Sequence, residues 1–378
     1  MADVAGTREP IYGPTAILPV ASQSTAPAFT ELTRSDLSWA AMSSTCVETQ
    51  TFYLTADNGH CGMAQVIYSN VGGLRTACQF NSKIFYPSSS SKPALWVSTL
   101  LSNHSFTPDH CSFSADSLDL TLSSSGDTYT IKSAVSATCL VNLTITRTAP
   151  GFHVGEDGKT LFGTDVSKPW GTMRHAFWPR ATLSGSIITP DDGTIDFTGR
   201  AMFVHALQGM KPHHAAAKWD FVNVQTPTYS AVLMSYTTPP SYGNTLVSVG
   251  GIATDGRILC AGPTNTITHT AIATDPEKTW PEPRALRVEW ASHSNTATLD
   301  SSTTNAVLSI HLPPRSDRVD VMAEVPSFVK AFVGTVSGAR PHIYQFAVDE
   351  AQLSVKDGAA DEVEEKGSLY YEATFISD

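Results

Sequence analysis

Apolar and polar residues alternate along much of this chain. Leu118, Leu120 and Leu122 are separated by single polar residues, so every second side chain is apolar. The same period of two recurs in four further stretches: 74–86, 129–135, 286–290 and 369–375. This alternation is typical of β-strands that bury one face. The pattern therefore predicts an all-β protein built from antiparallel sheets.

Turn signals separate these stretches. Asn58-Gly59 lies between two alternating runs and predicts a tight hairpin, because both residues tolerate a positive φ. Three further pairs of turn-forming residues follow: Gly126-Asp127, Asp192-Gly193 and Asp255-Gly256. The strands exceed the number in one small barrel, and closure into barrels protects sheet edges. We therefore expect two tandem β-barrels or sandwiches.

The stretch 150–169 is rich in Gly, Pro and charge and is a plausible connector between the two domains. The expected organisation is an N-terminal segment at 1–30, a first domain at 31–168 and a second at 169–378. One helix is expected near the C-terminus, because apolar residues recur at helical spacing from Asp317 to Val336. This amphipathic helix would either pack across a barrel or present an apolar face to a membrane or a ligand.

Composition excludes several classes of protein. The chain has 24 basic and 35 acidic residues, and its net charge of −11 argues against nucleic-acid binding. It contains no apolar run long enough for a membrane-spanning helix, and its first residues do not resemble a secretory signal. The six cysteines form no C-x-x-C pair, so we expect buried free thiols rather than a zinc site. Asn103 and Asn142 begin glycosylation sequons, which would matter only on a secretory route with a leader.

Recognisable catalytic motifs are missing. Gly158-Lys159-Thr160 resembles the end of a phosphate loop, but His153 stands where that loop needs glycine. The sequence has no G-x-S-x-G elbow and no H-E-x-x-H pair. Adjacent His213 and His214 would point to opposite faces of a strand, which argues against a shared metal. We expect neither a cofactor nor a metal.

Candidate ligand-binding residues cluster in the second expected domain. The run 205–219 holds three histidines, and a Pro-Pro turn follows at 236–243. An earlier segment, 169–180, interleaves Arg174 and Arg180 with aromatic residues, which indicates either a domain interface or a ligand wall. The predicted ligand contacts are Trp178, His205, Gln208, Met210, His213, Trp219, Tyr229 and Tyr236.

Several strings resemble the fungal survival-factor family. They include P-W-G-T-M-R-H-A-F-W-P-R at 169–180 and Q-G-M-K-P-H-H at 208–214, and the resemblance extends from about residue 6 to 375. Further similar strings lie at 47–53, 64–70, 318–324 and 341–346. The resemblance implies two lipocalin-like barrels that bind a hydrophobic ligand, ceramide in the best-known member. It also implies a cytosolic protein that contacts endoplasmic reticulum and Golgi membranes peripherally.

Three features depart from the family pattern. Members attach to membranes through an N-terminal amphipathic helix, whereas this chain passes from Met1 directly into the family-like segment 4–13. Ser235 stands where an acidic residue is expected, and 291–304 is rich in Ser, Thr and Asn. These differences fit either an ordinary relative or a paralogue with a new ligand.

Two functions therefore stay open. The first is a carrier of ceramide-like lipids, whose buried polar groups would need hydrogen-bond partners in the protein. The second is a pericyclase that folds a polyene, terpenoid or polyketide intermediate for a Diels–Alder-type cyclisation. Such an enzyme needs no nucleophile, because ordering its reactive partners lowers the barrier. Its candidate residues would be Arg174, His205, Trp219 and Tyr236.

Overall fold

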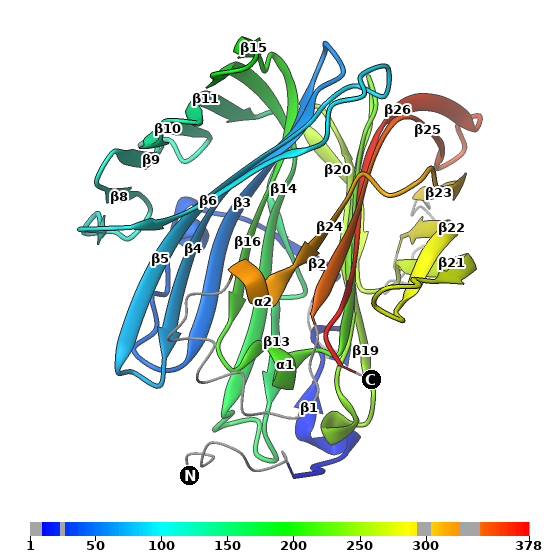
Figure 1. The fold of residues 1–378 in the computed structure, drawn as a ribbon. Coiled ribbons are helices and arrows are strands. Elements are labelled where there is room, and N and C mark those ends of the chain that lie inside the picture. Colours follow the sequence, from blue (N-terminus) through cyan, green and yellow to red (C-terminus); the bar gives the residue numbers. More distant parts are fainter. Residues whose placement is uncertain (1–9, 23–26, 293–303, 325–340, 378) are drawn as a thin grey trace.

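Two curled antiparallel sheets form the molecule in the computed structural model, which describes residues 10–22, 27–292, 304–324 and 341–377 (Figure 1). The first sheet contains β1 (Ile17–Leu18), β2 (Phe29–Glu31), β3 (Cys46–Ala56), β4 (Cys61–Val71), β5 (Arg75–Phe85), β6 (Leu95–Leu101), β7 (Ser105–Phe106), β8 (Phe113–Ala115), β9 (Leu118–Leu122), β10 (Thr128–Ser136), β11 (Cys139–Arg147), β12 (Phe152–Val154), β13 (Lys159–Phe162), β14 (Gly171–Thr189), β15 (Gly193–Asp196) and β16 (Gly199–Gln208). The second contains β17 (Lys218–Gln225), β18 (Ser230–Thr237), β19 (Leu246–Thr254), β20 (Arg257–Gly262), β21 (Thr266–Thr274), β22 (Pro281–Ala291), β23 (Thr304–His311), β24 (Asp317–Asp320), β25 (His342–Asp357) and β26 (Val363–Phe375).

Helices are short. The structure has two α-helical turns, α1 (Pro212–Ala215) and α2 (Val321–Glu324), and four 3-10 turns, η1 (Pro14–Ala16), η2 (Val20–Ser22), η3 (Arg34–Leu37) and η4 (Pro240–Tyr242), among the described residues. Within those ranges, no helix is long and apolar enough to cross a membrane. The all-β antiparallel class expected from the alternation is thus confirmed.

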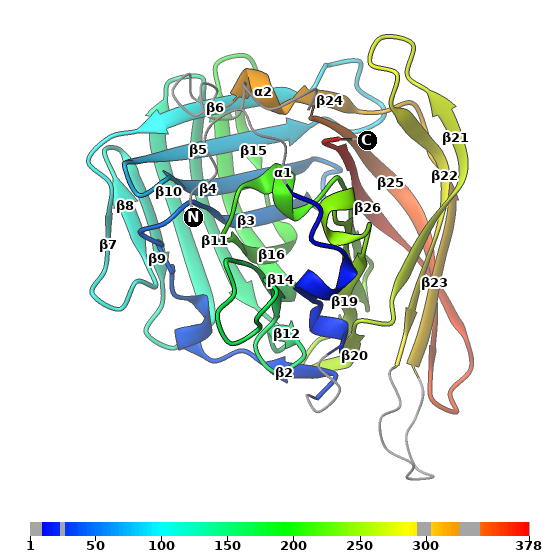
Figure 2. The ribbon, with the colours of Figure 1, turned by 90° about the horizontal axis from the view of Figure 1, so that it is seen from below.

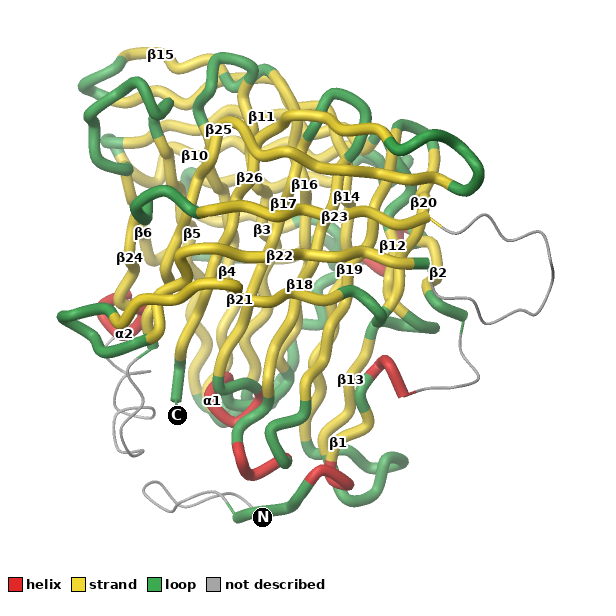
Figure 3. Tube along the Cα trace, turned by 90° about the vertical axis from the view of Figure 1, so that its right-hand side faces the viewer, coloured by secondary structure: helices red, strands yellow, loops and turns green. Residues whose placement is uncertain are grey.

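Each sheet is a half-barrel, and the two lie side by side (Figures 2 and 3). The main path of the first half-barrel runs β6-β5-β4-β3-β16-β14-β11-β10-β9-β8-β7, and that of the second runs β20-β19-β18-β17-β26-β25-β23-β22-β21. In the described part of the chain, no ladder joins the end strands of either path. Each sheet is therefore an open, curled half-barrel rather than the closed barrel expected from the sequence.

Strand alternation divides the buried side chains into three clusters. On β3, Phe52 and Leu54 face the interior of the first half-barrel, whereas Tyr53 between them faces the second sheet. A third cluster fills the second half-barrel, for example Val222 and Leu233. Strands such as β16 are buried on both faces, which explains their continuous apolar runs.

The predicted turns are confirmed. Asn58-Gly59 joins β3 to β4 in a regular antiparallel pair, and Gly59 has a φ of +86° that L-residues with side chains rarely adopt. The other three turn pairs connect β9 to β10, β14 to β15 and β19 to β20. All six cysteines are free and buried, as expected from their spacing.

The predicted C-terminal helix is wrong where it can be compared. Asp317–Asp320 forms β24 and pairs with β25 from Gln345 to His342, so ladder hydrogen bonds override the helical spacing there. Among the described residues one helical turn, α2, follows, and the amides of Met322 and Ala323 in it donate to the Asp320 carboxylate. The remainder of the predicted helix, 325–336, lies outside the described residues.

The strands change sheet at 209–217, whereas the sequence placed a domain boundary at 168/169. β14 and β16 belong to the first half-barrel, because β14 pairs with β11 and β16 pairs with β3 over ten residue positions. The two half-barrels also share the middle cluster of buried side chains. The division of the chain into domains thus stays a prediction.

Candidate functional site

A segment from Leu32 to Met42 crosses one end of the first half-barrel and is held by two polar side chains of β3. The Glu48 carboxylate accepts hydrogen bonds from the backbone amides of Ala40 and Ala41, each at 2.8 Å. The Gln50 amide donates to the carbonyl oxygen of Leu37 at 3.1 Å. Both side chains point into the interior, because they alternate with inward-facing Phe52. This end of the half-barrel is therefore polar inside.

His205 of β16 completes this polar end. Its Nε2 lies 2.8 Å from Glu48 Oε1, and both side chains are 1% exposed. Burial alone would raise the pKa of Glu48, but the bonds from His205, Ala40 and Ala41 outweigh it and hold that pKa below its ordinary value. Glu48 is thus an anion inside the half-barrel. Since a carboxylate only accepts, His205 Nε2 carries the hydrogen of this contact.

Several polar atoms in this interior have no hydrogen-bond partner in the described part of the chain. They include Trp39 Nε1, Gln50 Oε1, Tyr129 OH, Trp178 Nε1 and His205 Nδ1. The Tyr129 hydroxyl faces the Gln50 amide without reaching hydrogen-bond geometry. Buried polar groups without partners are uncommon, because each costs about 1–3 kcal/mol. Their concentration marks this interior as the candidate site.

Aromatic contacts connect these groups into one wall. The Trp39 ring lies 5.5 Å from His205, and Tyr129 lies 5.1 Å from Trp178, centroid to centroid. Phe203 contacts both rings of the second pair and lies 5.0 Å from Tyr129. His205 is also directly opposite Gln50 in the β16–β3 ladder. The unpartnered atoms thus line one continuous surface rather than scattered positions.

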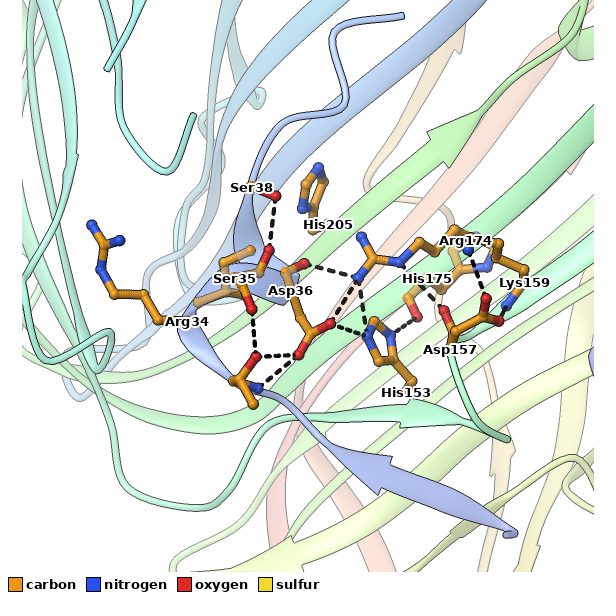
Figure 4. Close-up of polar contacts among 12 residues, drawn as sticks. Arg34, Ser35, Asp36, Ser38, His153, Asp157, Lys159, Arg174, His175 and His205 are labelled. Carbon is orange, nitrogen blue, oxygen red and sulfur yellow. Dashed lines mark hydrogen bonds and ion pairs between the residues drawn. The ribbon is translucent and has the colours of Figure 1, made fainter. Parts of the chain in front are cut away.

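A second polar cluster lies beside this end of the half-barrel (Figure 4). Arg174 of β14 donates to the Asp36 carbonyl at 2.9 Å and to His153 Nε2 at 3.0 Å. His153 Nδ1 lies 3.3 Å from the His175 carbonyl oxygen, so Nδ1 is the protonated nitrogen. Burial and the Arg174 charge lower the pKa of His153. These contacts hold η3 against β14 and so position the first part of the segment from Leu32 to Met42.

The first half-barrel has a seam between β6 and β10. β6 lies near β10, but no ladder joins them in the described residues. Leu95, Val97 and Leu101 of β6 and Val135 of β10 pack on the interior cluster while staying half-exposed. An apolar chain could therefore reach the interior between these strands without breaking a sheet ladder.

The structure does not gather the predicted ligand contacts into one site. Trp178 and His205 lie in the interior of the first half-barrel, and Arg174 lies at its polar end. Trp219 and Tyr236 pack together between the sheets at 5.4 Å, with Met210 in the same cluster. The remaining three are spread over the fold: Gln208 ends β16, His213 lies on α1, and Tyr229 packs against the second half-barrel.

The structure corrects one local expectation and selects between the two alternatives of another. His213 and His214 lie on the helical turn α1 rather than on a strand, because Pro212 starts a turn there, and their rings are 4.4 Å apart. Arg180 takes the interface role expected for its segment. It is buried and binds Asp255 at 2.7 Å and Ser230 at 3.0 Å, so it ties β14 to the second half-barrel.

The two sequons lie on the surface of the first half-barrel. Asn103 is exposed, has a φ of +53° and donates to Asp116 at 2.8 Å. Asn142 lies in a shallow groove of about 460 Å³ on the outer face, lined by Ser117, Asp119, Lys132, Ser133, Ala134, Val141 and Asn142.

Comparison with known proteins gives the family. The model of the Svf1 family matches residues 1–377. The chain belongs to the Svf1 family. A relative from Neurospora crassa, named ceramide-binding protein svf-1, is 55% identical over 378 residues, covering 100% of this chain and 98% of its own. Ceramide-binding protein svf1 of Emericella nidulans is 52% identical over 376 residues, covering 99% and 97%. The resemblance found in the sequence is thereby confirmed.

Solved structures share the fold of this Svf1-family chain at low identity. CghA has a TM-score of 0.59 and 11% identity, covering 88% of this chain and 89% of its own. Kievitone hydratase from Nectria haematococca has a TM-score of 0.51 and 11% identity, covering 97% and 99%. At such identity the likeness shows the arrangement of the sheets and does not transfer an activity.

Sequence reasoning missed Trp39, Glu48, Gln50 and Tyr129. A signal for two of them was present. Cys46, Glu48, Gln50 and Phe52 occupy every second position of β3, so two polar residues stand on the apolar face of a strand. A polar pair on a face that alternation assigns to the core is a direct indication of an interior polar site.

Proposed function

We propose that this chain binds ceramide or a closely related sphingolipid inside its first half-barrel and acts as a lipid carrier without catalysis. The observation that carries the proposal is the group of unpartnered polar atoms on the wall formed by Trp39, Gln50, Tyr129, Trp178 and His205. Polar atoms kept in an apolar interior gain most from a ligand that brings its own donors and acceptors.

The chemistry of ceramide matches this wall. Its amide carbonyl would accept from an indole N–H of Trp39 or Trp178, and its amide N–H would donate to Gln50 Oε1. Its hydroxyls can both donate and accept, which suits Tyr129. Its two hydrocarbon chains would be buried among apolar side chains, at roughly 0.8 kcal/mol per CH₂. The seam between β6 and β10 is the proposed entry route.

The relatives support the same ligand. Two Svf1-family proteins at 55% and 52% identity carry ceramide binding in their names. We extend this ligand to the present chain, together with peripheral contact with the membranes that hold it and a cytosolic location.

The test replaces polar side chains of the wall by apolar ones of similar size, and Gln50→Leu also removes the hydrogen bond to the Leu37 carbonyl oxygen. Tyr129→Phe and Gln50→Leu should each weaken ceramide binding about fivefold, because each removes one hydrogen bond of about 1 kcal/mol. Binding is measured by competition with a fluorescent ceramide in detergent. Tyr236→Phe is the matched control, because its hydroxyl is also buried without a partner among the described residues but lies between the sheets.

Stability measurements separate ligand binding from folding. The hydroxyl of Tyr129 has no partner in the described part of the chain, so Tyr129→Phe should leave the unfolding midpoint of the lipid-free protein unchanged or raised. Equal ceramide affinity in wild type, Tyr129→Phe and Gln50→Leu would overturn the proposed site. A selective loss in Tyr236→Phe would move the site to the interface between the sheets.

A further inference from the structure

Four large apolar residues are exposed at one end of the molecule. Ile11 is 82% exposed, Val166 52%, Trp170 45% and Leu246 65%. They belong to the residues before η1, the loop from β13 to β14 and the start of β19, which meet at the lower end of Figure 1 and face the viewer in Figure 2. We call this surface the apolar end.

Specific contacts hold these segments together. The Tyr12 ring lies 4.8 Å from Trp170 and 5.5 Å from Tyr242. Trp170 Nε1 donates to the Tyr242 hydroxyl at 2.9 Å, and the Tyr12 amide donates to the Ser241 carbonyl at 2.8 Å. The polar edge of Trp170 is therefore paired inside the protein while almost half of the side chain is exposed. The segments that carry the exposed apolar residues are thus held together by these contacts.

The charge of this end differs from that of the whole chain. Four neighbouring segments, 10–16, 163–170, 209–218 and 238–246, contain three lysines, Lys168, Lys211 and Lys218, and one acidic residue, Asp165. Three positive charges minus one negative charge give +2, against −11 for the chain. The segment of Lys211 lies beside Trp170, because Met210 is packed against Gly171. The segment of Lys218 lies in register with Leu246 through Thr237.

We propose that the apolar end docks onto an anionic lipid bilayer through the described loops themselves. Exposed apolar residues around a tryptophan, with lysines beside them, have the composition of a surface that sits at the boundary between headgroups and acyl chains. Lysines near an anionic leaflet add electrostatic attraction, which a chain with a net charge of −11 would otherwise lack. This surface is distinct from the interior ceramide site and does not depend on it.

The experiment measures sedimentation of the full chain with vesicles of phosphatidylcholine and phosphatidylinositol that contain no ceramide. The double variant Val166→Ser with Leu246→Ser should lose about tenfold in vesicle affinity for each apolar side chain removed. The matched control is Leu140→Ser with Ile188→Ser, two exposed apolar residues paired on the outer face of β11 and β14. That control should sediment as wild type does.

Two further measurements complete the test. Lys168→Glu with Lys211→Glu should weaken binding several-fold on anionic vesicles and leave binding to pure phosphatidylcholine unchanged. Ceramide affinity in detergent should be the same in all of these variants, so failure of docking is distinguishable from failure of the ceramide site. Equal sedimentation of the two apolar double variants, or no sedimentation of the wild type, would overturn the proposal.

Discussion

Replacing Glu48 by Gln tests whether the polar end of the first half-barrel depends on a buried anion. The carboxylate accepts three hydrogen bonds of 2.8 Å, from His205 and from the amides of Ala40 and Ala41, at 1% exposure. Glutamine has one acceptor oxygen, so its NH₂ group would face one of these donors. Losing a hydrogen bond to a charged group costs about 1.5–3 kcal/mol, and leaving a donor unpartnered costs about 1–3 kcal/mol. We therefore expect a loss of about 3–5 kcal/mol.

The assay is urea unfolding followed by circular dichroism at neutral pH. Glu364→Gln is the control, because Glu364 is exposed on β26 and its substitution should cost less than about 0.5 kcal/mol. An unfolding midpoint of Glu48→Gln within error of the control would refute the reasoning. It would mean that the interior tolerates the loss of its anion.

The pH dependence gives an independent check. The folded-state pKa of Glu48 is below its ordinary value of 4.5, so its contribution is fully present above pH 4.5. It is lost as the pH falls through the lower folded-state pKa. The gap in stability between wild type and Glu48→Gln should therefore narrow on acidification below pH 4.5. A gap that widens there would show that the carboxyl is protonated in the folded protein.

Three further predictions follow from single sites. Burial raises the pKa of Glu372, so the wild type should lose stability relative to Glu372→Gln as the pH rises above 4.5. This pH dependence has the opposite sign to that of Glu48, and the same urea-unfolding series measures it. Burial raises the pKa of Cys46 to about 11 and of Cys78 to about 12, so a thiol reagent at pH 8 should react with the folded protein far more slowly than with the urea-unfolded chain. Gly185→Ala should destabilise the protein by more than about 2 kcal/mol in thermal melts, because φ is +123° and a Cβ would lie 2.1 Å from the Asn142 carbonyl oxygen. Gly193→Ala is the control: its Cβ would meet open space, so the substitution should cost about 1 kcal/mol in the same melts.

The sequence predicted local structure well and long-range pairing poorly. Alternation placed 118–122 on one strand with the bounds that the structure has, and Asn58-Gly59 located a hairpin. The period of two reports only which side chains share a face, so it could not place β14 and β16 in the first sheet. It also could not show that Asp317–Asp320 has a partner in β25, which turned a helical pattern into a strand.

The candidate site was predictable in part for the same reason. His205 and Trp178 attracted attention by their chemistry, and both lie on the proposed wall. Glu48 is 157 positions from His205 along the chain, and no local pattern joins them. Only the β3–β16 ladder brings their strands together, so the pair emerges from tertiary structure rather than from spacing.

A comparison of the two half-barrels explains why the ligand is assigned to the first. In the second, interior aromatic side chains have protein partners: Trp290 donates to the Val232 carbonyl at 2.9 Å, and Tyr344 donates to Asp275 at 2.7 Å. Tyr371 donates to Asp220 at 2.6 Å, so the polar atoms of these three aromatic side chains are satisfied within the protein. In the first, Trp39, Tyr129 and Trp178 are equally buried and their polar atoms have no partner in the described chain. Burying each of these atoms without a hydrogen-bond partner costs the folded protein about 1–3 kcal/mol. Hydrogen bonds to the amide and hydroxyls of a bound ligand would offset that cost.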